Sequence, residues 1–495
     1  MNFCQRRVYM VSFILLFLMV APLVVFFAKG YRFDKLGKIF VYSGSVTIKT
    51  SPQNVDIYLN GKKKSKKTIN VINNSYTING IKPGKYLLKC EKPGYTSWEK
   101  NIQVHSGIST EFWNIVLLPK EDQDLQTYTT KPIKQFFLSP RENEEIVFFS
   151  EKENEQEIYL LDIKNNKQQK IFSTSEYTFI DAEKEENIEW STDNKRILIP
   201  FLDKKGDKNY VIAKIKKDET KDALNLHKLF NKNENEKKNF EQVRWMFDRT
   251  DELVILTTDH KLYYFDLSTP ENKILLDEQV SSFDFAGNRI YYSQLPNNFI
   301  WEIKNNDINT KKQITHKAID SNPDLFNKLI VYDEYRIALI NDKKELFVFN
   351  EEKEKGEVAM EKIYNDVQGI QLSDDGKKML FWTDNEIWVL MLREWEVQPL
   401  RQKGEKILIT RFSQPIRNIQ WMDNYENIIF SVGSYIKSAE IDLRDHVNVS
   451  NVKNLENNLE NRDIFYNKDN QMLIFKNKEQ LNSLILIDKK GFLGL

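Results

Sequence analysis

The segment Leu372-Ser373-Asp374-Asp375-Gly376-Lys377-Lys378-Met379-Leu380-Phe381-Trp382 indicates how most of this chain folds. Its first half is a polar turn in which Asp-Gly is a favoured hairpin pair, and its second half is an apolar run of strand length. The same order of turn and apolar run recurs, less regularly, along the chain after residue 132. The segment is therefore one copy of a repeat.

The repeat has eight recognisable starts. They lie near Phe136, Trp190, Trp245, Phe283, Asp320, Ile370, Ile419 and Ile464. A spacing of roughly 38 to 55 residues with paired apolar strands is typical of β-propeller blades, which bury their faces only against neighbouring blades. We expect a seven- or eight-bladed β-propeller over residues 133–495, with seven blades if the copy near Asp320 or Ile464 completes a neighbour. Pairing of the C-terminal strand with the first blade would remove an exposed edge.

The segment Leu372–Trp382 also resembles the WD40-like repeat of TolB-type propellers. The other copies keep the order of elements but lack the Asp-Gly pair. This resemblance implies a fold and not an activity, because propellers include hydrolases, lyases and inert scaffolds alike.

Composition agrees with a mainly β chain and excludes one class of partner. Aromatic residues make up 12% of the chain, and they recur in short apolar runs separated by turn residues. Lys+Arg and Asp+Glu number 72 each, so the formal net charge is zero. Without a general positive field, we expect no nucleic-acid partner.

The N-terminus carries an uncharged segment of membrane-spanning length. Val8–Ala28 reads VYMVSFILLFLMVAPLVVFFA, whereas the mean hydropathy of the whole chain is −0.55. At 1.5 Å per residue it can cross the roughly 30 Å hydrocarbon core as one helix. The alternative is a cleaved signal sequence, but Phe26 stands where a small residue is preferred. We expect residues 8–28 to be an uncleaved transmembrane signal anchor.

Orientation is harder to predict from charge. Arg6 and Arg7 precede the apolar segment, while the other flank carries Lys29, Arg32, Lys35 and Lys38. We expect the N-terminus inside, because a single anchor followed by a long polar chain is the usual way to tether a secreted domain. Residues 1–7 are then a cytoplasmic tail, residues 29–42 a juxtamembrane linker, and the bulk of the chain extracytoplasmic at the cell membrane.

A small β-sandwich is expected over residues 43–119, followed by a linker over residues 120–132. Strands are predicted at residues 45–49, 55–59, 86–89, 100–104 and 111–118. Turns of Pro, Gly and Asn separate these strands. We expect an antiparallel sandwich of about 75 residues.

These residues resemble a PEGA domain, a β-sandwich module common on prokaryotic surface proteins. The resemblance rests on strand order and on the turns Lys82-Pro83-Gly84-Lys85-Tyr86 and Lys92-Pro93-Gly94-Tyr95. The tetrapeptide that names the family is degenerate here and reads Pro52-Gln53-Asn54-Val55. Gly30–Asp34 and Trp98 are similar to membrane-anchored members of that family. The resemblance implies a surface or adhesive spacer and supplies no catalytic residues.

Motifs of common enzymes are missing from the sequence. It contains no G-x-S-x-G, G-x-x-x-x-G-K, G-x-G-x-x-G or H-E-x-x-H. Ser434-Tyr435-Ile436-Lys437 matches S-x-x-K without companion motifs, which favours a chance match at a blade edge. The five histidines are scattered without zinc-ligand spacing. We expect no catalytic residue, no cofactor and no metal site.

Two local features are candidates for binding. Lys62, Lys63, Lys64, Lys66 and Lys67 form a basic cluster that either binds an anion, such as a cell-wall polymer or lipid headgroup, or is a solvated loop. The tryptophans either form a sugar-stacking surface or belong to blade cores. Their recurrence at similar places in the repeats favours the cores.

Two hypotheses of function follow. The first is a non-catalytic, membrane-anchored surface protein, in which the sandwich spaces a propeller that binds a protein or envelope-polymer partner. The alternative is an extracytoplasmic hydrolase of polysaccharide or peptide with an acidic site at the propeller mouth. A convergent acidic cluster in the axial channel would favour the hydrolase, and a mixed or apolar channel would favour the scaffold.

Overall fold

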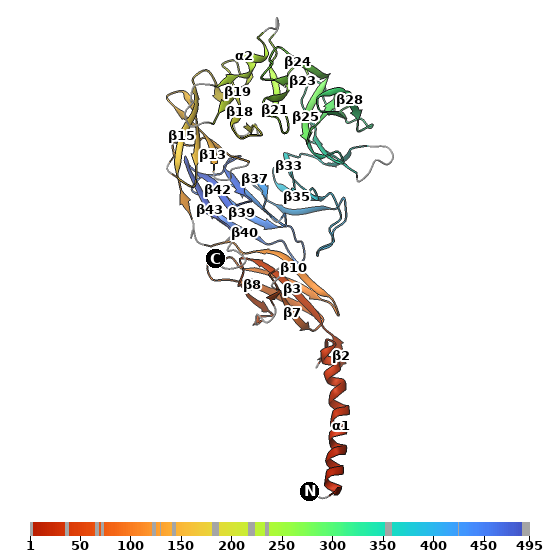
Figure 1. The fold of residues 1–495 in the computed structure, drawn as a ribbon. Helices are drawn as coiled ribbons and strands as arrows, with labels where there is room; N and C mark the ends of the chain where they lie inside the picture. The colour runs from red at the N-terminus through yellow and green to blue at the C-terminus, as the bar shows by residue number, and fades with distance from the viewer. Residues whose placement is uncertain are drawn as a thin grey trace.

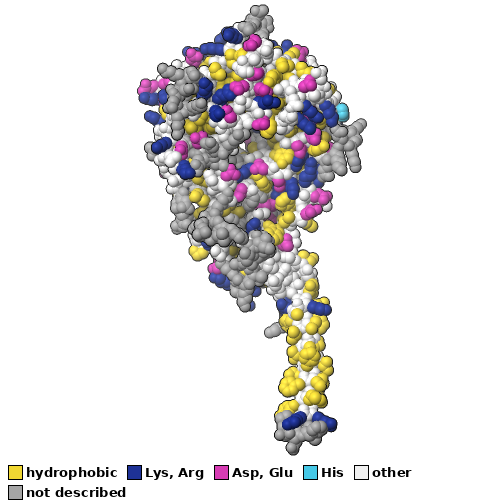
Figure 2. All heavy atoms as spheres, viewed as in Figure 1, with side chains coloured by type: hydrophobic (Ala, Val, Ile, Leu, Met, Phe, Trp, Pro, Cys, Tyr) yellow, Lys and Arg dark blue, Asp and Glu magenta, His cyan; other side chains and the backbone are white. Residues whose placement is uncertain are grey.

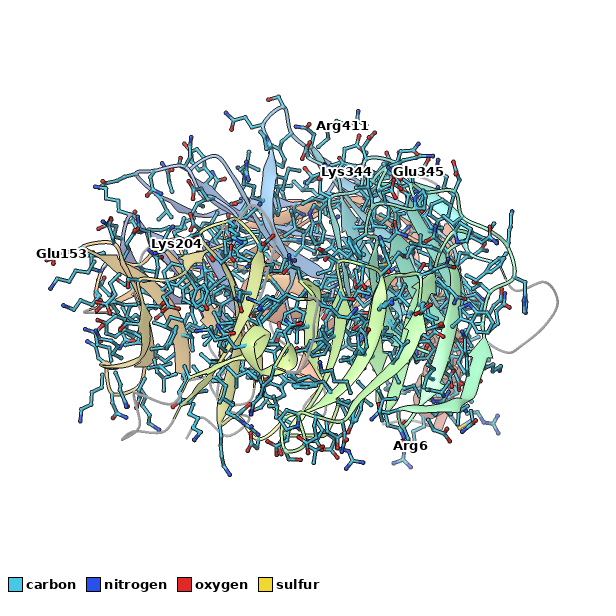
Figure 3. The ribbon with its side chains drawn as sticks, turned by 90° about the horizontal axis from the view of Figure 1, so that it is seen from above. Arg6, Glu153, Lys204, Lys344, Glu345 and Arg411 are labelled. Atoms are coloured by element: carbon cyan, nitrogen blue, oxygen red, sulfur yellow. The ribbon has the colours of Figure 1, made fainter. Side chains whose placement is uncertain are left out.

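A helix, a small pair of sheets and a ring of sheets follow one another along the molecule (Figure 1). The computed structural model describes residues 3–34, 39–64, 69–70, 74–120, 125–128, 130–140, 145–180, 188–215, 223–232, 237–351, 359–423 and 425–487. Figure 1 shows the ring face-on while the helix runs down the page. Figure 3 looks along the helix direction, and many strands of the ring lie in the plane of that picture. The two faces of the ring therefore point sideways relative to the helix.

Helix α1 spans Phe3–Ala28. In the part of the chain that the structure describes, Arg6–Ala28 is the one stretch long and apolar enough to cross a membrane, and none of it is buried. Such a helix is consistent with a membrane anchor or a signal sequence. Gly30 ends it with a φ of +94°, a conformation that glycine adopts without strain.

A short hairpin follows the helix directly. Strands β1 (Tyr31–Asp34) and β2 (Ile39–Tyr42) pair antiparallel, from Tyr31 opposite Tyr42 to Asp34 opposite Ile39. The stretch expected to be a juxtamembrane linker therefore contains a folded element. Alternation of aromatic and other residues in both strands was the signal for it in the sequence.

Two four-stranded sheets form the body that we call the sandwich. Their strands in spatial order are β10 (Ser109–Val116), β3 (Gly44–Ser51), β7 (Ser75–Ile81) and β6 (Ile69–Asn70) in one sheet, and β5 (Lys62–Lys63), β4 (Asp56–Leu59), β8 (Gly84–Glu91) and β9 (Trp98–Val104) in the other. Buried side chains from both sheets, including Val46, Ile48, Leu88 and Val104, form its core.

The sandwich departs from the sequence prediction in two ways. It is not wholly antiparallel, because β10 pairs parallel to β3, with Ser109 opposite Ser45. Strand β7 was not predicted, although it lies between β3 and β6. Parallel pairing joins segments far apart in the chain, so no local pattern indicates it.

After residue 125 the described residues form eight sheets with antiparallel neighbours, which together we call the ring. The first four sheets consist of β12 (Gln135–Leu138), β13 (Glu145–Lys152), β14 (Glu155–Asp162) and β15 (Lys167–Thr174); β16 (Thr178–Phe179), β17 (Glu189–Trp190), β18 (Arg196–Leu202), β19 (Lys208–Lys214) and β20 (Leu224–Asn225), followed by helix α2 (Leu226–Phe230); β21 (Phe240–Trp245), β22 (Glu252–Thr257), β23 (Lys261–Asp266) and β24 (Lys273–Glu278); and β25 (Val280–Ala286), β26 (Arg289–Gln294), β27 (Phe299–Lys304) and β28 (Asp307–Gln313).

The remaining four sheets continue the same order. They consist of β29 (Lys328–Asp333), β30 (Arg336–Ile340), β31 (Leu346–Asn350) and β32 (Glu361–Tyr364); β33 (Gly369–Leu372), β34 (Lys378–Trp382), β35 (Glu386–Met391) and β36 (Lys406–Arg411); β37 (Ile416–Trp421), β38 (Asn427–Val432), β39 (Tyr435–Glu440) and β40 (Val449–Asn454); and β41 (Ile464–Asn467), β42 (Met472–Asn477) and β43 (Gln480–Ile485), with β11 (Gln126–Thr127) beside β43. Six of the eight expected repeat starts lie in the first strand of a sheet, and Trp190 lies in β17, which pairs with β18 beside β16. The start expected near Asp320 falls before β29.

The core of the ring lies between neighbouring sheets. Leu380 and Val389 of the sixth sheet pack in one cluster with Trp421 and Phe430 of the seventh, and similar clusters join the other neighbours. Both faces of each sheet are thus buried, which explains the nearly continuous apolar runs in the sequence. Trp245 and Trp421 are buried, and Trp190, Trp382 and Trp388 pack against core clusters, as expected of blade-core residues.

The first and last sheets of the ring contact each other. Strand β11, from the expected linker, pairs with β43, with Gln126 opposite Ser483. Phe136 of the first sheet and Phe465 of the eighth contact each other with ring centroids 5.5 Å apart. Closure of the ring through β43, and with it the number of blades, stays a prediction that C-terminal truncation tests.

Candidate binding surfaces and the junction beside them

The sandwich meets the ring at the turn that follows β39, and we call this contact the junction. Lys100, in β9, points into the turn with none of its side chain exposed. Its Nζ donates to the carbonyl oxygens of Asp442 (2.7 Å), Arg444 (2.8 Å) and His446 (2.5 Å) and lies 2.8 Å from Glu440 Oε1. These oxygens replace the water that a buried ammonium group loses.

Other side chains extend the junction on both sides of Lys100. Trp98 Nε1 donates to Glu440 Oε2 at 2.8 Å. The guanidinium carbon of Arg444 lies 3.9 Å from the centroid of the Phe112 ring, and Nη2 donates to a β10 carbonyl at 2.9 Å. Gln398, from the loop between β35 and β36, donates to a β10 carbonyl at 2.9 Å and accepts from a β10 N–H at 3.0 Å. The two bodies are therefore held by directional contacts that are buried or partly buried.

Asp442 makes the junction sensitive to acid. Burial opposes its ionisation, but the hydrogen bonds and charge of Arg444 and the charge of Lys100 outweigh burial and hold the pKa of Asp442 below its ordinary value. A lowered pKa stabilises the fold above about pH 4, and that contribution is lost as the pH falls through the pKa of the folded state.

We therefore expect Asp442→Asn to make the unfolding free energy less dependent on pH below about pH 4 than it is in the parent protein. Urea denaturation of the full-length chain in detergent, repeated down the acid range, measures this. Equal pH dependence in variant and parent would contradict the role assigned to Asp442.

Near the ring centre, Arg244 neutralises two carboxylates from neighbouring sheets. The first strands of the sheets, such as β21, β25 and β33, lie nearest the centre in Figure 1. Arg244 bridges Glu189, at 3.0 Å between Nε and Oε1, and Asp284, which accepts from Nη1. The remaining carboxylate oxygens accept from backbone N–H groups of Trp245 (2.8 Å) and Val331 (2.7 Å). Burial disfavours the charged guanidinium, but these carboxylates outweigh it and raise the pKa of Arg244.

A groove of about 790 Å³ opens between the fifth and sixth sheets. Its lining is mostly polar: Lys362, Ile363, Tyr364, Asn365, Asp366, Thr383, Asp384, Asn385 and Glu386. In an antiparallel sheet, the turns after the second and fourth strands lie at one end, and the turns after the first and third lie at the other. The groove is lined by the turns after β32 and β34, which are the fourth and second strands of their sheets. The junction turns follow β39 and β35, which are the third strands of theirs. The groove therefore opens on the ring face away from the junction turns.

Glu386 at the groove floor is fixed in place. It accepts from Tyr364 Oη and Trp388 Nε1, both at 2.8 Å, and from Arg411 Nη2. Burial alone would raise the pKa of Glu386. The hydrogen bonds from these three donors outweigh burial, so the pKa lies below its ordinary value. Lys344, Glu345 and Arg411 lie on the same side of the ring (Figure 3), and charges of both signs are mixed over the surface seen in Figure 2. The groove thus presents uncharged polar groups, the exposed carboxylates of Asp366 and Asp384, and the side chain of Lys362, which is paired with Glu345.

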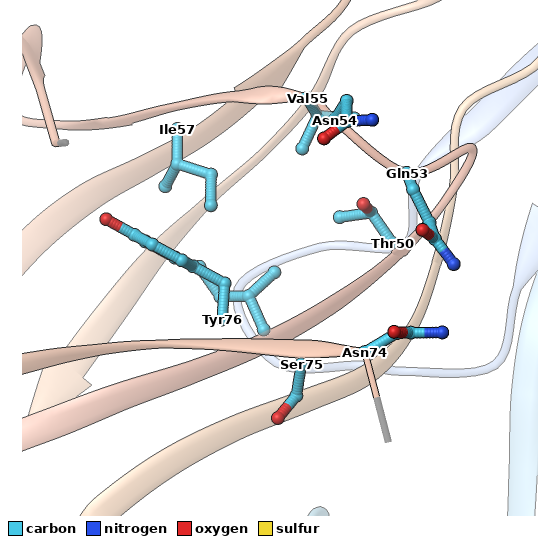
Figure 4. Close-up of a pocket in the computed structure, with 9 residues that line it drawn as sticks. Thr50, Gln53, Asn54, Val55, Ile57, Asn74, Ser75 and Tyr76 are labelled. Atoms are coloured by element: carbon cyan, nitrogen blue, oxygen red, sulfur yellow. The ribbon is translucent and has the colours of Figure 1, made fainter. Parts of the chain in front are cut away.

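The sandwich holds a smaller pocket of about 60 Å³ (Figure 4). Ile48, Val55, Ile57 and Tyr76 form its apolar side, while Thr50, Gln53, Asn54, Asn74 and Ser75 form its polar mouth. Three of its lining residues, Gln53, Asn54 and Val55, belong to the degenerate tetrapeptide. This volume has room for a few water molecules and is much smaller than the 300–1,000 Å³ typical of ligand sites.

The predicted basic cluster is only partly described. Lys62 and Lys63 are exposed in β5, and Lys63 Nζ lies 2.8 Å from Asp56 Oδ2. Lys64 follows, partly exposed, while Lys66 and Lys67 lie outside the described residues. The anion-binding patch stays a prediction.

The remaining candidates have structural partners. Ser434 donates to Asn454 Oδ1 at 3.0 Å and Lys437 to Asn451 Oδ1 at 2.6 Å, so the S-x-x-K pair serves strand pairing at the edge of the seventh sheet. Among the described residues, no group of three or more His, Cys, Asp or Glu side chains is placed to hold a metal ion.

The chain has likenesses to known proteins in sequence and in structure. A search of curated proteins finds no match to the chain. Solved structures that resemble it include the Dos1 propeller (11% identity, TM-score 0.47, 72% of this chain and 94% of that one) and the computationally designed Ika8 protein (10%, 0.44, 72% and 97%). The Cps50 (Swd1) β-propeller domain of Myceliophteria thermophila is also similar (8%, 0.38, 73% and 98%). The family model that matches the sandwich, over residues 43–117, is that of the PEGA domain.

Proposed function

We propose that this protein is a non-catalytic scaffold of the cell surface, anchored by α1, whose sandwich holds the ring away from the membrane to bind a protein or envelope-polymer partner. The observation that carries this proposal is the junction. A spacer that positions a binding module must be joined to it firmly, and Lys100 is buried among oxygens of the ring.

The arrangement of carboxylates supports a scaffold over a hydrolase. Glycoside hydrolysis needs one carboxyl group able to give up a proton and a second one poised beside the substrate. Glu189 and Asp284 are instead paired with Arg244, and Glu386 accepts three hydrogen bonds. We infer that a partner binds in the groove that Glu386 helps to line, because its volume of about 790 Å³ and its polar lining suit an extended polymer or peptide segment.

The anchor itself is testable by one substitution. Leu16 lies in the middle of α1 with 54% of its surface exposed, as expected for a residue that faces lipid. Leu16→Arg should cost about 2.5–3.5 kcal/mol of insertion free energy on translocon scales. We expect the parent to stay in the membrane fraction after carbonate wash, and the variant to be partly released. Complete release of the parent would contradict the anchor.

Orientation is tested on intact cells. With the N-terminus inside, external protease should digest the sandwich and the ring while sparing residues 1–28. Full protection of residues 45–495 would reverse the orientation and would restore nucleic acid as a candidate partner of the lysine cluster.

Scaffold and hydrolase give different results with isolated envelopes of the source organism. Full-length protein in lipid nanodiscs is incubated with the envelope polymer fraction and then separated by sedimentation. A scaffold should sediment with the polymer and release no soluble fragments, and Asp366→Lys/Asp384→Lys should reduce sedimentation. Time-dependent appearance of reducing sugars or new peptide termini would refute the scaffold and establish the hydrolase.

A further inference from the structure

The hairpin formed by β1 and β2 packs directly on the end of α1. Phe26 of the helix contacts Tyr31, with ring centroids 5.3 Å apart, and stacks on Phe40 at 5.8 Å. Arg32 Nη1 donates to the carbonyl of Phe27 at 3.0 Å. The hairpin is therefore an extension of the helix and keeps a fixed position relative to its end.

The same hairpin exposes more aromatic surface than a soluble element normally does. Phe33, Phe40 and Tyr42 are 44%, 40% and 44% exposed, and the Phe33 and Phe40 rings lie 5.4 Å apart. In the space-filling view the hydrophobic surface of the helix reaches up to the base of the sandwich (Figure 2). Adjoining exposed aromatic rings indicate a surface that another apolar phase covers.

Distance along the helix identifies that phase. Between Arg7 and Phe27 the helix rises about 30 Å, the thickness of the hydrocarbon core. With Arg7 at one boundary, Phe27 lies at the other, and the hairpin falls in the headgroup layer. Tyrosine and basic residues concentrate in that layer, and the stretch from Lys29 to Lys38 carries four basic residues and one acidic residue.

We propose that the hairpin is a lipid-binding element that lies in the phospholipid headgroup layer of the membrane spanned by α1, with Phe33 and Phe40 at the boundary of the acyl chains. This inference rests on the proposed anchor. The hairpin also sets the position of the sandwich through two contacts. Ser106 Oγ donates to the Tyr42 carbonyl at 2.9 Å, and Gly107, at φ +71°, lets the Tyr42 ring approach closely.

Nitroxide labels on the full-length chain in phospholipid nanodiscs test the proposal. Cys4 is replaced by Ser, and Cys90 is left in place because burial raises its pKa to about 12 and leaves it unreactive in the folded protein. Labels are placed singly by Phe33→Cys, Phe40→Cys and Leu16→Cys. Phe247→Cys, in the turn between β21 and β22 and 58% exposed, is the aqueous control. Relaxation by oxygen reports lipid, and relaxation by a soluble nickel chelate reports water. Each variant is used only if its circular dichroism spectrum matches that of the parent protein.

We expect the oxygen-to-nickel ratio at positions 33 and 40 to exceed that at position 247 several-fold and to approach that at position 16. A lipid signal at position 16 with aqueous signals at 33 and 40 overturns this inference and leaves the anchor intact. An aqueous signal at position 16 overturns the anchor as well. A second copy of the chain could instead cover the surface. In that case the labels at positions 33 and 40 would be shielded from both reagents, and their spectra would show dipolar broadening that disappears when unlabelled chain is added. That result would overturn the lipid site.

Discussion

Full-length protein with Lys100→Met is expected to lose about 3–5 kcal/mol of unfolding free energy. Methionine has a similar length but no charge, so the substitution leaves three carbonyl groups buried without the Nζ donor and the Glu440 carboxylate without its counter-charge. Removal of one partner from a buried, hydrogen-bonded ion pair is among the costliest single changes in a protein. Urea denaturation in detergent, followed by circular dichroism, gives the difference.

The matched control is Lys89→Met, in the neighbouring strand β8. Lys89 Nζ lies 2.6 Å from Glu91 Oε1, but both side chains are about a third or more exposed, so water replaces the lost partner. We expect no measurable change for this variant. An equally small effect at Lys100 would show that the junction contributes little to stability.

Deletion of residues 480–495 is expected to destabilise the whole ring and to cause aggregation. The deletion removes β43, in which Leu481 and Leu484 are 0% and 2% exposed, and it frees the edges of β42 and β11. Loss of one buried leucine costs about 2–5 kcal/mol, so losing two approaches the 5–15 kcal/mol that stabilises a typical domain. The freed edges can then pair with other chains.

Light scattering during size-exclusion chromatography and thermal unfolding measure this outcome. A shorter deletion, of residues 488–495, leaves every described strand in place and serves as the control. A chain lacking residues 480–495 that stays monomeric with an unchanged melting temperature would refute closure of the ring through β43.

Repeats and apolar runs made the strand-rich architecture predictable. Each blade-type sheet reads the same way locally, so Trp245 and Trp421 could be assigned to cores without knowledge of their neighbours. Strand β7 was missed because its apolar positions, Ile78 and Ile81, are three residues apart where a regular strand would alternate. The interruption coincides with a register shift between β3 and β7.

The junction could not be predicted from local sequence patterns. Strand β9 alternates buried and exposed residues, and Lys100 stands in phase with Trp98, Ile102 and Val104. A lysine on the apolar phase was a visible signal for a buried charge, but its partners lie more than 300 residues away. The groove was equally hidden, because its lining comes from turns of two sheets that become neighbours only when the ring forms.

The sideways orientation of the ring has a consequence for partners. If α1 stands across a membrane, the faces of the ring are roughly perpendicular to the membrane plane, and the groove between the fifth and sixth sheets opens laterally. A ligand tethered in the same membrane, or in a layer running alongside it, would then reach the groove by two-dimensional diffusion at a high effective concentration. Weak contacts within the groove would then suffice for stable occupancy.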